Sequence, residues 1–166
     1  YSIEFSAGVA AVAFSPDGQT ILTAGGDQII HLWERTTGRE LNALNRPAPF
    51  SAVIFSPDGK SLLITGADPI VILLELATNK ETTYETQHGD AINAAAFSPD
   101  GQLVLTASSD LTSRLWQLSD GAELHQLSGH TDTVNVIVCS PDGRTLLTGS
   151  DDRTARLWDV ESLSLI

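Results

Sequence analysis

Short runs of apolar and β-branched residues alternate along this chain with brief polar segments, and no run continues with a helical period. Within residues 131–162, three such runs lie at Val134–Cys139, Thr145–Thr148 and Thr154–Val160. Runs of this length, rich in Val, Ile, Leu and Thr and bounded by Gly, Pro, Asp and Ser, are typical of β-strands. The pattern therefore predicts an all-β chain in which strands and tight turns follow one another.

The tetrapeptide Ser-Pro-Asp-Gly separates the first two runs and occurs four times in the chain. Its serines are spaced by 41, 42 and 42 residues and are Ser15, Ser56, Ser98 and Ser140. Proline presets φ for the first central position of a turn, aspartate tolerates the second, and glycine supplies the positive φ that closes it. The repeat therefore predicts a repeated hairpin and needs no functional explanation.

A second marker follows the same period near the end of each unit, where a tryptophan or leucine stands six residues after an aspartate. These residues are Trp33, Leu74, Trp116 and Trp158, with Asp27, Asp68, Asp110 and Asp152 before them. Two markers in one register predict four repeats in a single segment, at about residues 1–41, 42–83, 84–125 and 126–166. Weaker strand patterns in residues 38–46, 79–87 and 121–129 predict a fourth strand in each unit.

The charge balance narrows the classes of partner. The chain is 42% apolar and 18% charged, which is typical of a globular protein, and its net charge is −12. Such an acidic chain repels phosphate backbones and anionic lipids, so we expect neither nucleic acid nor membrane as a partner. Electrostatic attraction favours a basic partner. The alternative is that the acidic residues only keep the surface soluble.

Targeting and redox features are few. The single cysteine, Cys139, excludes an intrachain disulfide and a thiol-only metal site, and residues 1–8 lack the basic and apolar regions of a signal peptide. These features favour a cytoplasmic location. The chain contains no methionine, even at position 1, which suggests that it was processed or excised from something longer.

The unit of four strands in about 42 residues, with "GH" upstream and "LWD" at the end, resembles the WD-repeat β-propeller family over essentially the whole chain. The regular "FSPDG" turns are similar to those of bacterial members. The resemblance implies a propeller of four-stranded antiparallel blades, with four blades in this chain. Because propellers of the family usually close with seven or eight blades, it implies about half a ring.

An open half-ring would leave two apolar blade faces bare. A second copy could complete an eight-bladed ring as a two-fold homodimer through the first and last repeats, or the blades could belong to a longer propeller; a contracted four-blade ring is less favoured. By repeat phase, Tyr1 corresponds to Gln126 and Ile166 to Leu124. We therefore hypothesise that residues 161–166 and 1–5 complete one outer strand across a chain junction.

The resemblance also implies a buried polar network of His, Ser or Thr, Asp and Trp in each blade. The third unit offers His88, Ser108, Asp110 and Trp116, and the fourth offers His130, Ser150, Asp152 and Trp158. The first unit has Phe5, Gly25, Asp27 and Trp33, and the second has Arg46, Gly66, Asp68 and Leu74. Because both lack the His and the hydroxyl of this pattern, we expect these two units to be less rigid or to be supported by other contacts.

Enzymatic function is not favoured by these residues. His130, Ser150 and Asp152 match a Ser-His-Asp set by type, but the same spacing recurs in the third unit and belongs to the structural pattern of the family. No phosphate-binding loop or metal-ligating pair is present, so we expect no catalytic residue, no cofactor and no metal. A propeller hydrolase is the alternative, because other propeller families also use Ser-Pro-Asp-Gly hairpins.

The resemblance implies a non-catalytic interaction scaffold or sensor module that binds peptides or protein domains on a ring face. The positions that would contact a partner are Asp90, Ser109, Asp132 and Asp151. Their acidity favours a basic peptide, and solvated loop charge is the competing interpretation. A further alternative is a purely structural segment of a larger signalling protein.

Overall fold

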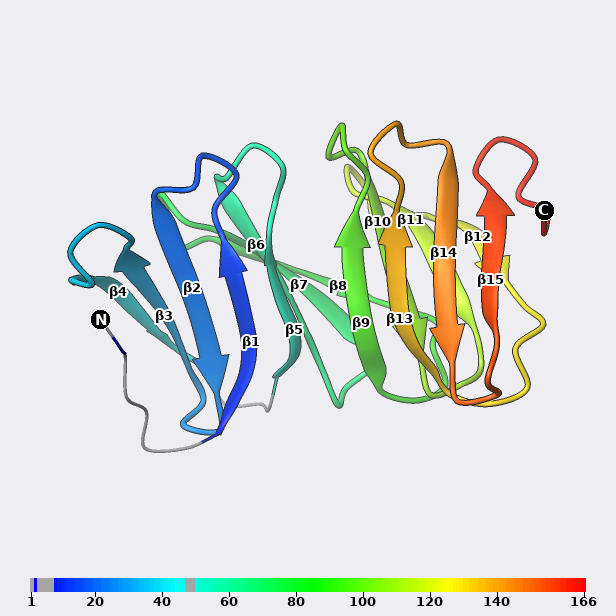
Figure 1. The fold of residues 1–166 in the computed structure, drawn as a ribbon, viewed down its shortest axis with the longest axis horizontal. Helices are drawn as coiled ribbons and strands as arrows, with labels where there is room; N and C mark the ends of the chain where they lie inside the picture. The colour runs from blue at the N-terminus through cyan, green and yellow to red at the C-terminus, as the bar shows by residue number, and fades with distance from the viewer. Residues whose placement is uncertain (1, 3–7, 47–49) are drawn as a thin grey trace.

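The computed structural model describes residue 2 and residues 8–46 and 50–166, and every element named in it is a β-strand (Figure 1). Sheet 1 contains β1 (Val9–Phe14), β2 (Thr20–Gly25), β3 (Ile29–Glu34) and β4 (Glu40–Asn45). Sheet 2 contains β5 (Phe50–Phe55), β6 (Ser61–Gly66), β7 (Ile70–Glu75) and β8 (Glu81–Glu85). Sheet 3 contains β9 (Ile92–Phe97), β10 (Leu103–Ser108), β11 (Ser113–Gln117) and β12 (Glu123–Leu127). Sheet 4 contains β13 (Val134–Cys139), β14 (Thr145–Ser150) and β15 (Ala155–Asp159).

Each sheet is an antiparallel meander in which strands pair in chain order. The predicted fourth strands are confirmed as β4, β8 and β12. In sheet 4, Leu165 bridges to Trp158, and the Asp159 N–H donates to the Ser164 carbonyl at 2.9 Å. Residues 161–166 thus begin an outer strand as predicted, whereas residues 1 and 3–5, the other half of that hypothesis, lie outside the described residues.

The Ser-Pro-Asp-Gly segments are the turns between the first and second strands of every sheet, along the top of Figure 1. In the first, the Ser15 hydroxyl donates to Asp17 Oδ1 at 2.6 Å, and the Gln19 N–H donates to the same oxygen at 2.9 Å. The glycines that close the four turns have φ between +67° and +72°. The hairpin prediction is therefore confirmed, and the serine hydroxyl lowers the pKa of Asp17 by stabilising its carboxylate.

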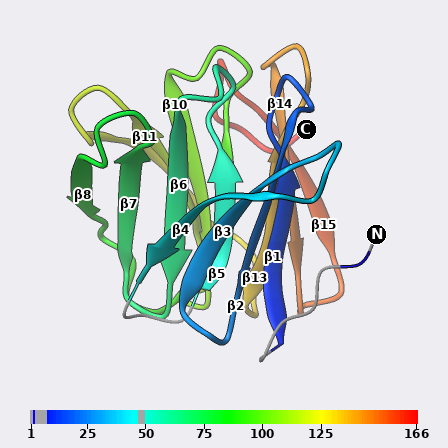
Figure 2. The same ribbon diagram turned by 90° about the vertical axis from the view of Figure 1, so that its left-hand side faces the viewer.

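The four sheets pack face to face in chain order, with their first strands, β1, β5, β9 and β13, lying next to one another (Figures 1 and 2). Sheets 2 and 3 each pack one face on the following sheet and the other face on the preceding sheet. Leu22 and Leu32 of sheet 1 pack with Val53 and Leu62 of sheet 2 in one buried cluster. The same positions of sheets 3 and 4 pack together in a second cluster, which includes Leu105, Leu115, Ile137 and Leu146.

Sheet 1 and sheet 4 lie at opposite ends of this row (Figure 1). Among the described residues the arrangement is thus open, with one sheet face at each end that no other sheet covers. A contracted ring of four blades, the least favoured alternative from the sequence, would instead place these two sheets against each other.

Candidate functional site

The buried polar network of sheet 3 is centred on His88, whose side chain is fully buried. Its Nδ1 lies 2.8 Å from Asp110 Oδ2, and its Nε2 lies 2.7 Å from Thr106 Oγ1. Trp116 Nε1 donates to the same threonine oxygen at 2.9 Å. Because Thr106 accepts from the indole, its own proton can go to His88 Nε2, which leaves the imidazole proton on Nδ1 to donate to Asp110. Each polar atom in this series of hydrogen bonds, which runs from the Trp116 indole through Thr106 and His88 to Asp110, then has a partner.

Sheet 4 repeats this arrangement. His130 Nδ1 lies 2.7 Å from Asp152 Oδ2, His130 Nε2 lies 2.8 Å from Thr148 Oγ1, and Trp158 Nε1 donates to Thr148 at 3.0 Å. The order of donors and acceptors is therefore the same in both sheets.

The two carboxylates also fix the turns in which they lie. Asp110 Oδ1 accepts from the Thr112 hydroxyl at 2.6 Å, and Oδ2 accepts from the Gly89 N–H at 3.0 Å. Burial alone would raise the pKa of Asp110, but the hydrogen bonds from Thr112, His88 and Gly89 outweigh it and lower that pKa to about 2. The Thr154 hydroxyl is the main cause that holds the pKa of Asp152 far below its usual value.

The hydroxyls of the networks differ from the sequence prediction. Ser108 Oγ donates to the Asp90 carbonyl and accepts from the Asp110 N–H, each at 3.1 Å. Ser150 makes the corresponding contacts with Asp132 and Asp152. These serines close the second strand beside the turn, whereas the threonine two residues earlier on the same strand face reaches both the imidazole and the indole. Thr106 and Thr148, not Ser108 and Ser150, therefore join the His to the Trp.

Sheet 1 has part of the network and an additional histidine. Trp33 Nε1 donates to Thr23 Oγ1 at 2.9 Å, so the prediction that this unit lacks the hydroxyl is wrong. His31 on β3 stacks on Trp33 and lies 3.4 Å from Asp27 Oδ2 and 2.6 Å from Glu40 Oε1. His31 thus approaches Asp27 from the strand. Phe5, at the usual histidine position, lies outside the described residues.

Sheet 2 replaces the network with apolar and ionic contacts. Ile64 and Leu74, both buried, occupy the threonine and tryptophan positions, so neither an indole N–H nor a hydroxyl has to be paired there. Arg46, at the histidine position, forms an ion pair with Glu81 at 2.9 Å and donates to the Asn45 carbonyl at 2.8 Å. Asp68 is exposed. Apolar and ionic contacts therefore take the place of the missing network in sheet 2.

The candidate partner-binding residues lie along the edge opposite the Ser-Pro-Asp-Gly turns, at the bottom of Figure 1. Asp90, Asp132 and Asp151 are exposed, and Ser109 is half-buried. Asp90 and Ser109 belong to adjoining loops of sheet 3, and Asp132 and Asp151 belong to those of sheet 4, because the Ser109 N–H donates to the Ala91 carbonyl and the Asp151 N–H to the Thr133 carbonyl.

Two asparagines that sequence reasoning missed support this edge. Asn93 Nδ2 donates to Ser109 Oγ at 3.0 Å and to the Val134 carbonyl of the next sheet at 3.1 Å. Asn135 Nδ2 donates to Asp151 Oδ1 at 2.7 Å. The two asparagines are one repeat apart in the sequence, and this spacing could have indicated their shared role. Asn93 thus ties the edge of sheet 3 to that of sheet 4.

Comparison with known families agrees with this geometry. The sequence model described as "WD domain, G-beta repeat" matches residues 2–34, 79–117 and 121–159, which together make up more than half of the chain. The chain belongs to the WD40 repeat family. The WD40 matches leave out residues 35–78, the segment in which Ile64 and Leu74 replace the threonine and tryptophan.

A curated relative is similar to a short part of this WD40 chain. It is an uncharacterized WD repeat-containing protein from Synechocystis sp., 51% identical over 37 residues. The matched segment covers 22% of this chain and 11% of the relative. The chain therefore spans only a small part of the curated protein that it matches.

WD40 repeats are generally non-catalytic, and His130, Ser150 and Asp152 do not form a nucleophile–base pair here. The Nε2 atom of His130, which would serve as the base, faces the buried Thr148. The Ser150 hydroxyl donates instead to the Asp132 carbonyl at 2.9 Å. The three residues have the contacts of a structural WD40 network.

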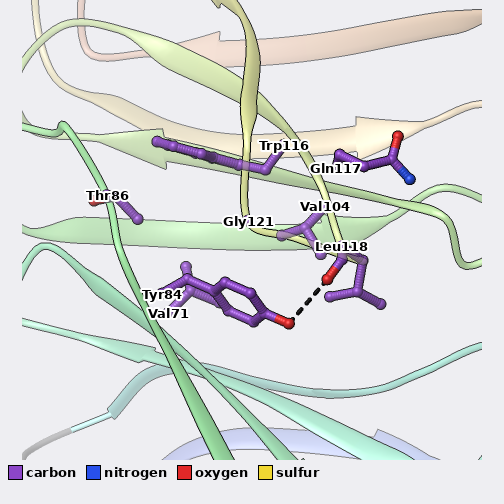
Figure 3. Close-up of a pocket in the computed structure, with 8 residues that line it drawn as sticks. All are labelled: Val71, Tyr84, Thr86, Val104, Trp116, Gln117, Leu118 and Gly121. Carbon is purple, nitrogen blue, oxygen red and sulfur yellow. Dashed lines mark hydrogen bonds between the residues drawn. The ribbon is translucent and has the colours of Figure 1, made fainter.

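The seam between sheets 2 and 3 contains an apolar pocket lined by residues that include Val71, Tyr84, Val104 and Trp116 (Figure 3). The Tyr84 hydroxyl crosses the seam and donates to the Leu118 carbonyl at 2.9 Å. The open space is about 10 Å³, about enough for one water molecule. The pocket is therefore a packing seam between WD40 repeats and has no room for an organic ligand.

Two other kinds of site are absent from the described residues. Across residues 8–46 and 50–166, no group of three or more His, Cys, Asp or Glu side chains is arranged to hold a metal ion. No helix in the described part of the chain has the length and apolarity that a membrane crossing requires.

Acidification should destabilise the fold through the network of sheet 3. Burial lowers the pKa of His88 in the folded state. As the pH falls below about 6.5, the His88 imidazole therefore takes up a proton more readily in the unfolded chain than in the folded one. The pKa of Asp110 is also lowered, so the stability it contributes above its unfolded pKa of about 4 is lost as the pH falls toward about 2. The lowered pKa values of His88 and Asp110 both predict that the urea midpoint of unfolding falls steadily from pH 7 to pH 3.5. A midpoint that stays constant over this range would contradict the assignment.

Proposed function

We propose that this chain is a non-catalytic interaction module of the WD40 type that binds a basic peptide or a basic segment of a protein domain. The binding surface is the edge formed by Asp90, Ser109, Asp132 and Asp151. The observation that carries the proposal is that three exposed carboxylates of two neighbouring sheets lie along one edge.

Hydrogen bonds from neighbouring side chains hold the loops of this edge in place, which favours binding without a large rearrangement. Ser108 and Ser150 donate to the carbonyls of Asp90 and Asp132, and the turns that follow are fixed by Asp110 and Asp152. A surface that is already ordered loses little conformational entropy when it binds a partner.

Charge also favours a basic partner. The chain carries 21 acidic and 9 basic residues, so its field attracts Lys- and Arg-rich segments over long distances. Such attraction between exposed charges is screened by salt, so binding should weaken as the ionic strength rises.

The test uses a fluorescently labelled Lys- and Arg-rich peptide and fluorescence anisotropy at low salt. The Asp132→Asn/Asp151→Asn double variant should weaken binding about three- to tenfold, because each exposed ion pair contributes up to about 1 kcal/mol. Asparagine keeps the Oδ1 acceptor that each aspartate uses locally, so the loops should stay in place.

The matched control is Asp120→Asn/Glu161→Gln, which removes the same charge from exposed residues at the opposite edge. It should leave the affinity nearly unchanged. Equal weakening by both pairs would mean that only net charge attracts the peptide. No measurable binding by the unchanged chain would mean that these aspartates are solvated loop charge only.

We also propose that the chain associates with itself through its first and last repeats, so that two copies of four blades complete an eight-bladed ring. The uncovered faces of sheets 1 and 4 support this proposal. A structural segment of a larger signalling protein is the alternative that the sequence leaves open.

A further inference from the structure

The outward face of sheet 4 is apolar at positions that are less exposed in every other sheet. Leu147 is 44% exposed, whereas its repeat equivalents Leu22, Leu63 and Leu105 are all 0% exposed. Leu157 is 40% exposed, whereas its equivalent Leu115 is 3% exposed. In sheets 1 to 3 this face packs on the following sheet, and in sheet 4 no described sheet follows.

These side chains form one continuous surface. Val138 pairs with Leu147 across β13 and β14, and Leu147 pairs with Leu157 across β14 and β15, so the three stand side by side on one face. Val136, two residues before Val138 on β13, extends the row and is 52% exposed. We call Val136, Val138, Leu147 and Leu157 the sheet-4 end surface.

The other end of the row has the complementary face uncovered (Figure 2). Val12 is 69% exposed, whereas its equivalents Val53 and Ile137 are 1% and 3% exposed because the preceding sheet covers them. Phe14 is also exposed, and it pairs with Ile21 across β1 and β2. We call Val12, Phe14 and Ile21 the sheet-1 end surface.

The internal interfaces show what fits each end surface. Leu22 packs in one cluster with Val53, and Leu105 packs in another with Ile137. The sheet-4 end surface carries the residues equivalent to Leu22 and Leu105, and the sheet-1 end surface carries the residue equivalent to Val53 and Ile137. A second copy of this chain therefore offers a face of the required type to each end.

Resting on the self-association proposed above, we infer that the sheet-4 end surface of one copy packs on the sheet-1 end surface of a second copy, and the reverse. Each contact would continue the internal stack of sheets. Two such contacts related by a two-fold axis leave neither end surface exposed to water.

A polar contact adds a second observation. Between sheets 3 and 4, Asn93 Nδ2 donates to the Val134 carbonyl at 3.1 Å. One repeat further, Asn135 is exposed on sheet 4, and the repeat equivalent of Val134 in sheet 1 is the exposed Val9. The same hydrogen bond can therefore form from Asn135 of one copy to the Val9 carbonyl of the other.

The test is the solution mass of the 166-residue chain, by light scattering and sedimentation over a wide concentration range. The unchanged chain should have twice the mass of 17.7 kDa. Leu147→Asp and Val12→Asp should each weaken the dimer about 100-fold or more, because an unpaired carboxylate would be buried at both contacts. Leu124→Asp is the matched control: Leu124 is 47% exposed but lies on β12, outside both end surfaces, so this variant should remain dimeric.

Mixing the two monomeric variants tests the pairing itself. In a mixed dimer both substitutions meet at one contact and the other contact is intact, so a population of heterodimer should appear. Circular dichroism should show that each variant keeps its β-structure.

A folded monomer at all concentrations, a dimer that survives Val12→Asp, or open polymers would overturn the inference. The Asp132→Asn/Asp151→Asn variant should leave the mass unchanged. A failure of peptide binding is thereby distinguished from a failure of dimerisation.

Discussion

Replacing Asp110 by alanine should lower the free energy of unfolding by about 1–3 kcal/mol, because it leaves the buried Nδ1 N–H of His88 without its acceptor. His88 is fully buried, and its Nδ1 proton has Asp110 Oδ2 as its acceptor at 2.8 Å. The Thr112 hydroxyl would lose Asp110 Oδ1 as its acceptor, and the Gly89 N–H would lose Oδ2. Urea denaturation followed by tryptophan fluorescence at pH 7 measures the loss.

The matched control is Asp68→Ala, at the equivalent position of sheet 2. Asp68 is exposed, and Ile64 and Leu74 occupy the network positions of its sheet, so the loss should stay within about 0.5 kcal/mol. Equal losses for the two variants would show that the aspartate acts through its turn alone and that the pairing with His88 adds nothing.

The architecture could be predicted from the sequence because local chemistry and repeat spacing point to the same elements. The Ser-Pro-Asp-Gly turns need only their own residues to close, as the Ser15 and Asp17 contacts show. Strand limits were less secure: the run predicted at Thr145–Thr148 extends to Ser150 in β14. Turn residues fix where a strand starts, whereas its end depends on pairing with neighbours.

The hydroxyl of the network was misplaced by two residues, although the sequence contains a signal for it. Ten residues before each tryptophan stands a threonine: Thr23, Thr106 and Thr148. Ten residues before Leu74 stands Ile64 instead. An indole N–H in a buried site needs an acceptor, and a leucine does not, so the two positions change together.

The contacts that replace the network in sheets 1 and 2 had no such signal. His31 reaches Asp27 and Glu40 because β3 lies between the turn and β4, and Arg46 reaches Glu81 from the segment before sheet 2. The Arg46–Glu81 pair depends on the packing of segments that are distant in sequence, whereas the His31 pairs lie within consecutive strands of one sheet. Spacing within one repeat does not indicate them.

The Gly121→Ala variant tests one such contact, between sheets 2 and 3. Gly121 has φ +71°, and a Cβ added there would lie 2.3 Å from Cδ1 of Tyr84. Tyr84 cannot easily move away, because its hydroxyl is held by the Leu118 carbonyl (Figure 3). The variant should therefore lose about 3 kcal/mol or more, part of it from the left-handed backbone and the rest from displacement of the ring.

Gly101→Ala separates these two causes. Gly101 has the same φ of +71°, but a Cβ there would lie 3.6 Å from the nearest atom, in Pro57, so only the backbone cost of about 1–2 kcal/mol should be measured. Adding Tyr84→Ala to Gly121→Ala should remove the steric part, and the coupling energy of this double-mutant cycle then measures the clash between the added Cβ and the ring. Equal losses for the two glycine variants would contradict the role assigned to Tyr84. Because sheet 2 lacks the threonine–tryptophan pair of its neighbours, a large loss for Tyr84→Ala alone would mean that an aromatic ring across the seam supplies stability that the other sheets obtain from buried hydrogen bonds.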